Sequence, residues 1–373
     1  MEIRSGSTMG LRAVEHALTQ LWSQAASAEL REEGHALIRA RALTLIICSL
    51  AEGDTSGLAS IVDEISDKHP CRAIVIVPAE ANAGLGLEAS LAVYCRASVG
   101  SGAHVCGERI TISVASDAVG ELPSALRSVL LPDLPVFVWC RGPLPSYSKV
   151  LESFLDFSDR IIVDSGDFPE PLALTEFVAR GQIGPAFSDL AWTRLTSWRQ
   201  LAAQFFDGPN LRPYLKSLNH AVIEYGAPGG RRHGIAPEAL LLGGWLASRL
   251  NWRQRGRGPL SSSTLELVQN DRTILLDFRS VSSQHDLVSL RLTAQGDPPA
   301  LFSVARLKDP GCIETKAEVT GAPPITRIAH AKDESLVHLL SSELGIVGHD
   351  AVFEETLLAA ETIASHVSRV SQT

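Results

Sequence analysis

The stretch LLPDLPVFVWCRGPLP, residues 130–145, brings a thiol and a guanidinium together at the end of a short apolar run. Residues 136–139 have the pattern of a buried strand that ends at Trp139, and Cys140 and Arg141 follow it directly. A reactive thiolate needs a nearby base or a helix amino terminus, and a phosphatase-like loop would place backbone amides between the cysteine and the arginine. The adjacent pair fits neither arrangement. We therefore expect Cys140 to be unreactive. For Arg141 we favour a structural salt bridge over an anion or partner contact, and we keep it as a candidate partner-binding residue.

Two carboxylates follow the next predicted strand, in VDSGDFPEP at residues 163–171. Asp164 and Asp167 could hold a metal ion or act as an acid and a base. Aspartate, serine and glycine are also typical of turns, and proline commonly opens a helix. We favour a role in the turn and cap for both carboxylates, and we keep them as candidate partner contacts.

Tryptophan and arginine recur in SDLAWTRLTSWRQLAAQFFD, residues 188–207, whose apolar residues have helical spacing. Trp192 and Arg199 lie on one face of this predicted helix, and Arg194 lies one turn before Trp198. Core packing is the usual role of such a stripe, but tryptophan and arginine also dominate protein interfaces. Trp192, Arg194 and Arg199 are therefore candidate partner-binding residues, together with Trp139 and Arg141.

Further arginines gather in RLNWRQRGRGP, residues 249–259, although the whole chain has a net charge of −9. This segment could bind RNA or phosphate. A solvated turn or an acidic protein partner agrees at least as well with the overall charge, so Arg253 and Arg255 are candidate partner contacts. An acidic chain is a poor general ligand for nucleic acid or an anionic membrane, and we expect neither as a partner.

Motifs for cofactors, metals and nucleophiles are absent or incomplete. GLGLEA at residues 84–89 has the glycine spacing of a dinucleotide loop, but it lies too far behind the preceding predicted strand, and a strand rather than a helix follows it. The six cysteines show neither a Cys-x-x-Cys pair nor zinc-ligand spacing, and we expect them to be buried thiols. We predict no catalytic, cofactor-binding or metal-binding residue.

The elements that position these residues predict an α/β fold. Residues 41–50 and 72–77 are continuous apolar runs, which is typical of strands buried on both faces of a sheet. Strands and helices alternate up to residue 206, whereas closely spaced strands between residues 263 and 319 indicate an antiparallel meander. We predict a three-layer Rossmann-like α/β sandwich over residues 1–209 and an α+β domain with an antiparallel sheet over residues 210–373, joined at DGPNLRP.

Composition places the chain among ordinary globular proteins, with 45% hydrophobic and 20% charged residues over 373 positions. The first 22 residues lack the long apolar core of a signal peptide, and the longest apolar run, residues 42–51, is half the length of a membrane span. We therefore expect a cytoplasmic protein without a membrane partner.

Three unusual stretches in this order and spacing resemble the glucose-6-phosphate dehydrogenase assembly protein family, OpcA: LPDLPVFVWCRGPLP, RIIVDSGDFPEP and DLAWTRLTSWRQLAAQFFD. RALTLIICSL and HPCRAIVIVP also resemble the N-terminal part of that family. The resemblance implies a non-catalytic cytosolic protein without a cofactor, which binds glucose-6-phosphate dehydrogenase, helps its active oligomer to form and raises its activity. It favours a docking or structural role for the loop that follows Trp139.

The chain departs from the family in that loop. Relatives commonly carry a second tryptophan where this chain has Cys140, and a polar residue where it has Pro143. A docking contact made by the loop would therefore be altered here. The alternative interpretation is an enzyme or sensor that binds a sugar phosphate or nucleotide at the carboxyl ends of the strands in the first domain.

Overall fold

A computed structural model describes residues 2–5, 10, 13–32, 36–50, 57–79, 86–97, 103–142, 150, 154–168, 175, 184–226, 234–254, 263–331, 335–346 and 348–370. The chain divides into two compact units. Unit 1 comprises Met1–Phe168, Gly181–Ser188 and Leu336–His349, and unit 2 comprises Pro169–Arg180, Asp189–Ser335 and Asp350–Thr373. The predicted α/β class with two sheets is confirmed, while the predicted boundary between independent domains at residue 209 stays a prediction.

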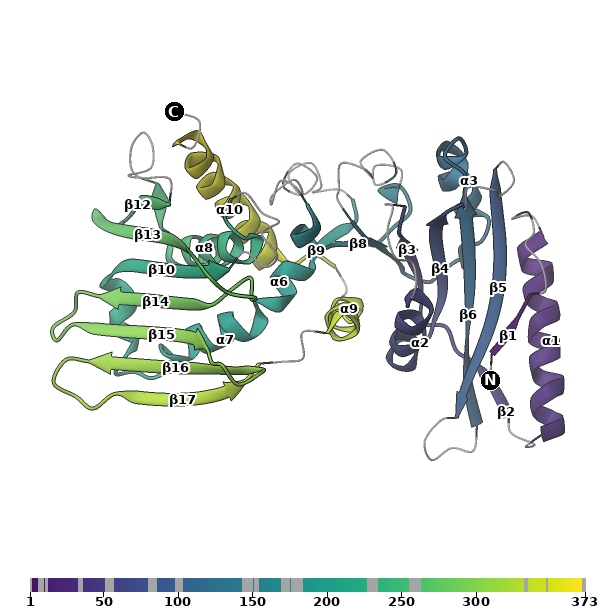
Figure 1. The fold of residues 1–373 in the computed structure, drawn as a ribbon, viewed down its shortest axis with the longest axis horizontal. Helices are drawn as coiled ribbons and strands as arrows, with labels where there is room; N and C mark the ends of the chain where they lie inside the picture. The colour runs from purple at the N-terminus through teal and green to yellow at the C-terminus, as the bar shows by residue number, and fades with distance from the viewer. Residues whose placement is uncertain are drawn as a thin grey trace. The chain divides into compact units, whose positions relative to one another are not determined.

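Unit 1 is built on a mixed sheet with a parallel centre (Figure 1). In spatial order the central strands are β6 (Ala103–Val114), β4 (Cys71–Pro78), β3 (Leu43–Cys48), β7 (Val136–Cys140), β8 (Arg160–Val163) and β9 (Ala186–Asp189). The pairs β6–β4, β4–β3, β3–β7 and β7–β8 are parallel. This is the strand order 3-2-1-4-5-6 of the doubly wound dinucleotide fold, so the Rossmann-like prediction is confirmed.

The remaining strands of unit 1 extend the sheet beyond β6. Strand β5 (Leu87–Ala97) pairs antiparallel with β6, β1 (Glu2–Arg4) pairs with β5, and β2 (Ala36–Arg39) pairs parallel with β6. In the part of unit 1 that the structure describes, the bounded helical elements are α1 (Val14–Glu32), α2 (Leu58–Lys68), the short η2 (Val119–Glu121), α3 (Leu122–Arg127), the short η3 (Ser165–Asp167) and α9 (Leu336–Leu344). All six residues of β3 are buried, as its continuous apolar run predicts.

The cysteines behave in two ways. Cys95 and Cys106 face each other directly across the antiparallel β5–β6 pair and form a disulfide, so the expectation of free thiols is wrong for these two. Sequence spacing could not show this pair, because it depends on the register of a hairpin. Cys48, Cys71 and Cys140 are free and buried, as expected, whereas Cys312 is free but only partly buried, so the expectation of burial is wrong for it.

Unit 2 contains the predicted meander, packed against helices (Figure 1). Its strands in spatial order are β11 (Arg253–Gln254), β12 (Thr264–Gln269), β13 (Arg272–Val281), β10 (Leu218–Gly226), β14 (Ser289–Ala294), β15 (Ala300–Arg306), β16 (Cys312–Val319) and β17 (Ile325–His330). Neighbours pair antiparallel except β10 and β13, which are parallel. The helical elements are α6 (Leu190–Arg194), α7 (Thr196–Gln204), the short η4 (Arg212–Lys216), α8 (Pro237–Leu250) and α10 (Ala351–Val370).

Close packing of α8 against α10 depends on one glycine. A Cβ atom at Gly244 would lie 2.5 Å from the backbone oxygen of Thr356 and 2.8 Å from the Cβ of Ala360. Only glycine permits this approach of two helix backbones. The leucine-rich α8 is therefore a core helix of unit 2.

The sequence missed the shortest elements. The sequence does not predict β1, β2, β9, β11 or β17. Of these strands, β1, β2, β9 and β11 are too short to show a period of two. The sequence also predicts helices over residues 147–157 and 171–180, and both ranges lie largely outside the described residues. Among the helices that the structure describes, none combines the length and the apolar character needed to cross a membrane.

Candidate functional site

Cys140 and Arg141 lie where the strand order of unit 1 reverses. From β3 the chain passes through α2 to β4 on one side, and β7 pairs with β3 on the other side. The carboxyl ends of β3 and β7 are therefore neighbours, and the backbone N–H of Arg141 donates to the carbonyl of Cys48 at 2.9 Å. In open α/β sheets this switch point is the usual place for a ligand. The end of β7 thus occupies the position in the fold where a binding site is most expected.

We define the Arg141 site as Ser49, Trp139 and Arg141. The guanidinium of Arg141 lies over the Trp139 ring, with its Cζ 5.5 Å from the ring centroid. Its Nη1 donates a long hydrogen bond, 3.5 Å, to the hydroxyl of Ser49, the residue that follows β3. Arg141 is half-buried, whereas Trp139 is 2% exposed. The tryptophan predicted as a partner contact is therefore a buried support under the arginine.

The thiol of Cys140 is not part of this site's chemistry. Cys140 is 1% exposed, and burial raises the pKa of its thiol to about 12. Cys48, its partner in the β3–β7 register, is also buried, and burial raises its pKa well above the ordinary value. Both thiols are therefore protonated near neutral pH, which agrees with the prediction that Cys140 is unreactive.

The glycine-rich segment around residue 86 does not lead into a helix, as a dinucleotide loop would. Gly86 leads directly into β5, which is an antiparallel strand rather than the helix that a pyrophosphate site requires. In the doubly wound fold the fingerprint belongs instead between β3 and α2, residues 49–57, where the sequence has glycines only at Gly53 and Gly57. That segment of the sequence lacks the G-x-G-x-x-G spacing.

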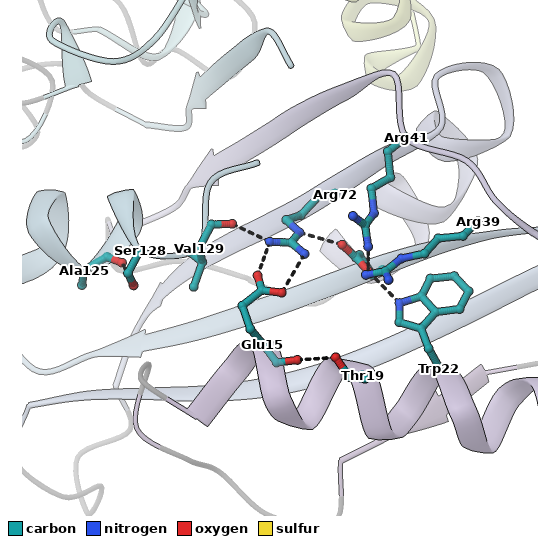
Figure 2. Close-up of polar contacts among 10 residues, drawn as sticks. Glu15, Thr19, Trp22, Arg39, Arg41, Arg72, Ala125, Ser128 and Val129 are labelled. Carbon is teal, nitrogen blue, oxygen red and sulfur yellow. Dashed lines mark hydrogen bonds and ion pairs between the residues drawn. The ribbon is translucent and has the colours of Figure 1, made fainter. Parts of the chain in front are cut away.

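A second polar group lies inside unit 1, and sequence reasoning missed it (Figure 2). We call it the Glu108 cluster; its members are Glu15, Trp22, Arg39, Arg41, Arg72 and Glu108. The carboxylate of Glu108 is fully buried, and one of its oxygens, Oε2, accepts from the indole of Trp22 at 2.8 Å, from Arg39 at 2.7 Å and from Arg41 at 3.0 Å. Its other oxygen, Oε1, accepts from Nε of Arg72 at 2.6 Å.

Arg72 is the second centre of the cluster. It is 1% exposed, and its guanidinium also donates to the carboxylate of Glu15 on α1 and to the carbonyl of Val129 at 2.7 Å. Burial lowers the pKa of Arg72, but the hydrogen bond to Glu15 and the charge of Glu108 outweigh it, so that the pKa is raised overall. The cluster therefore joins α1, β2, β4 and β6 through ion pairs around the buried Glu108 carboxylate.

The sequence does carry a signal for this cluster. Arg72 interrupts the apolar run CRAIVIV, and Glu108 stands in the strand GERITISV. A charged residue inside a doubly buried strand must have a partner, because burying an unpaired charge is costly. The two strands pair with Arg72 opposite Glu108, but that register could not be read from the sequence.

Asp164 and Asp167 lie in a turn after β8. The side chain of Asp164 accepts from the backbone N–H of Gly166 at 3.0 Å and begins η3, while Asp167 is the exposed last residue of η3. This geometry matches the favoured role in a turn and cap. Among the residues that the structure describes, no three His, Cys, Asp or Glu side chains gather in an arrangement that could hold a metal ion.

The tryptophan and arginine residues of α6 and α7 are tied into unit 2. Arg199 stacks on Trp192 with its Cζ 3.4 Å from the ring centroid, as their shared helix face suggested. Trp192 is 4% exposed and its indole donates to Asp350 at 3.2 Å, which is the residue that also caps α10. Arg194 pairs with the buried Glu238 at 3.4 Å. These side chains hold α6 against α8 and α10.

The basic segment is described only in part. Arg253 is exposed in the short strand β11, and Arg255 lies outside the described residues. Arg194 also lines a pocket of unit 2 together with Trp198, His285, Asp286 and Arg306, where Arg306 rather than Arg194 lies over the Trp198 ring, at 5.7 Å.

Comparisons with known proteins find matches to both units of the chain. Two family models, described as the N-terminal and the C-terminal domain of the glucose-6-phosphate dehydrogenase subunit, match residues 62–180 and residues 185–357, respectively. The chain belongs to this family, OpcA. Its relatives include proteins named "Putative OxPP cycle protein OpcA" from Nostoc punctiforme and from Synechocystis. The one from Nostoc punctiforme is 28% identical over 82% of this chain and 67% of the relative, and the one from Synechocystis is 28% identical over 90% and 71%.

The fold of this OpcA family member also resembles solved dehydrogenase structures. A levoglucosan dehydrogenase in its apo form superposes with a TM-score of 0.50 over 89% of this chain and 97% of that protein, at 8% identity. At that identity the likeness concerns the fold alone. It agrees with the Rossmann-like strand order of unit 1 and with the sheet of unit 2.

Proposed function

We propose that this protein is a non-catalytic assembly factor and allosteric activator of glucose-6-phosphate dehydrogenase in the oxidative pentose phosphate pathway, and that it acts in the cytoplasm. The observation that carries the proposal is membership of the glucose-6-phosphate dehydrogenase subunit family over both units of the chain. The names of the cyanobacterial relatives, which refer to the OxPP cycle, support the same pathway.

The chemistry of the switch point supports a non-catalytic role. The thiols nearest to it, Cys48 and Cys140, are buried with raised pKa values, so neither is a ready nucleophile. The sequence between β3 and α2, residues 49–57, lacks the G-x-G-x-x-G fingerprint that lets a backbone approach a pyrophosphate.

A protein without catalytic groups can raise the activity of its partner only by preferring one state of that partner. A coupling free energy of about 1–3 kcal/mol changes an affinity by about 5–150-fold. We propose that the preferred state is the oligomer or conformation of the dehydrogenase that binds glucose 6-phosphate well. Thermodynamic linkage then requires glucose 6-phosphate to tighten the complex of the two proteins by the same factor.

The exposure of the predicted partner residues limits which of them can contact the dehydrogenase. Among the predicted partner residues, Arg253 is exposed and Arg141 is half-buried, whereas Trp139 and Trp192 are buried supports. We propose that the basic segment around Arg253 meets an acidic surface of the dehydrogenase, where complementary charge mainly speeds the encounter.

The experiment is a titration of labelled dehydrogenase with this protein, with and without saturating glucose 6-phosphate. We expect a lower Kd for glucose 6-phosphate in the complex, a tighter complex in its presence, and no turnover by this protein alone. Cys140→Ala is the control variant and should retain activation, because its thiol is buried and protonated. Equal affinity in both titrations, alongside a real drop in the Kd of the substrate, would break the thermodynamic cycle and reject the two-state account.

A further inference from the structure

Arg141 differs from other described arginines of unit 1 in the groups that its side chain contacts. Ion pairs with carboxylates hold the arginines at positions 39, 41, 72, 109, 127 and 160. Arg141 forms no ion pair with any described carboxylate, and its described side-chain contacts are the Ser49 hydroxyl and the Trp139 ring. A half-buried guanidinium without a counter-ion is unusual, because desolvation favours pairing.

A second polar group at the same place also has no partner. The indole N–H of Trp139 is buried and has no hydrogen-bond acceptor among the described residues. Buried donors are satisfied in nine cases out of ten or more, so an unsatisfied one needs an explanation such as a missing ion. Both donors belong to residues of the same strand end, two positions apart.

The surrounding backbone is also suited to an anion. Gly142, directly after Arg141, has a φ of 88°, a conformation that glycine adopts without a steric cost. Helix α2 follows β3 and returns antiparallel to it toward β4, so its amino terminus lies at the carboxyl edge of the sheet. The residue before α2 is Gly57, which has no side chain to cap the helix. A helix amino terminus at a switch point attracts negative charge.

From this geometry we propose that the Arg141 site binds the phosphate group of a small phosphorylated metabolite. The guanidinium supplies a planar fork that matches phosphate, and the Ser49 hydroxyl adds a further donor. The absence of the glycine fingerprint in residues 49–57 favours a phosphomonoester over a dinucleotide. This proposal concerns the isolated protein and does not depend on activation of a dehydrogenase.

The experiment measures binding to the full-length protein by two readouts. Thermal unfolding is followed in inorganic phosphate, in glucose 6-phosphate and in glucose, at constant ionic strength. In parallel, the indole N–H resonance of Trp139, assigned with the variant Trp139→Phe, is followed by NMR during the phosphate titration. We expect saturable stabilisation by both phosphate-containing probes, none by glucose, and a saturable shift of the Trp139 resonance.

The variants separate a specific site from general charge. Arg141→Gln should weaken phosphate binding about tenfold or more, because a charge-assisted hydrogen bond is lost, and Arg141→Lys should be intermediate because it keeps the charge without the fork. The matched control is Arg127→Gln, an exposed arginine of α3 that pairs with Asp156. It should leave the Kd within a factor of about two.

Three outcomes would overturn the proposal. Phosphate could fail to shift the Trp139 resonance or to stabilise the protein. Arg127→Gln could weaken binding as much as Arg141→Gln, which would show non-specific attraction. Finally, phosphate could fail to bind while Arg141→Gln weakens the complex with the dehydrogenase, which would assign Arg141 to a carboxylate of the protein partner.

Discussion

The Glu108 cluster and the Arg141 site both combine arginine with tryptophan in unit 1, but the polar groups of these residues have different surroundings in the two regions. In the cluster, the indole of Trp22 and the guanidinium groups of Arg39, Arg41 and Arg72 all donate to the Glu108 carboxylate. At the strand ends, the indole of Trp139 has no acceptor among the described residues, and Arg141 has only a long bond to a hydroxyl.

The difference separates architecture from binding. A buried charge that is fully compensated holds elements together, because breaking it leaves an unpaired partner in a medium of low dielectric constant. A partly exposed charge without a counter-ion contributes little to folding and remains available to a ligand or partner. The two regions therefore predict different responses to the same kind of substitution.

The largest effect is expected from Glu108→Gln. This change removes the only carboxylate of the cluster that is fully buried, and leaves the guanidinium groups of Arg39 and Arg41 without their counter-ion. Removing one partner of a buried ion pair lowers the free energy of unfolding by about 3–5 kcal/mol. We expect the free energy of unfolding of unit 1 to fall by that amount in urea titrations, monitored by hydrogen exchange in β4 and β6.

Glu121→Gln is the matched control, because Glu121 is an exposed carboxylate of η2 in the same unit. Its substitution should change the free energy of unfolding by no more than about 0.5 kcal/mol. An equally small loss for Glu108→Gln would show that the Glu108 cluster does not stabilise unit 1, and would contradict the structural role assigned to it.

A smaller effect is expected from Arg39→Gln. Arg39 donates to Glu108 at 2.7 Å, and its Cζ lies 4.6 Å from the centroid of the Trp22 ring, but its side chain is 38% exposed. A hydrogen bond to a charged group is worth about 1.5–3 kcal/mol, and solvent screening reduces this value. We expect a loss of about 1–2 kcal/mol in urea unfolding; no loss would show that Arg41 and Arg72 compensate Glu108 alone.

The sequence predicted the large elements better than the sites. Continuous apolar runs identified β3 and β4, and helical spacing identified the α6–α7 region, because burial imposes a period on the side chains. The switch point was found only as a strand end, because Ser49 and Arg141 are 92 positions apart in sequence and meet through strand pairing. The Glu108 cluster and the Cys95–Cys106 disulfide were missed for the same reason.

The smallest effect on folding is expected from Arg141→Gln, the same substitution as at Arg39. Its cation–π contact at 5.5 Å and its 3.5 Å hydrogen bond are weak, so the loss in urea unfolding should stay below about 1 kcal/mol in a buffer without phosphate. Phosphate should enlarge this difference, because a ligand stabilises only the protein that binds it, by about 2.7 kcal/mol at a hundredfold excess over Kd. A loss in plain buffer as large as that of Arg39→Gln would mean that Arg141 is structural after all, and a difference that phosphate does not enlarge would remove the distinction between the two regions.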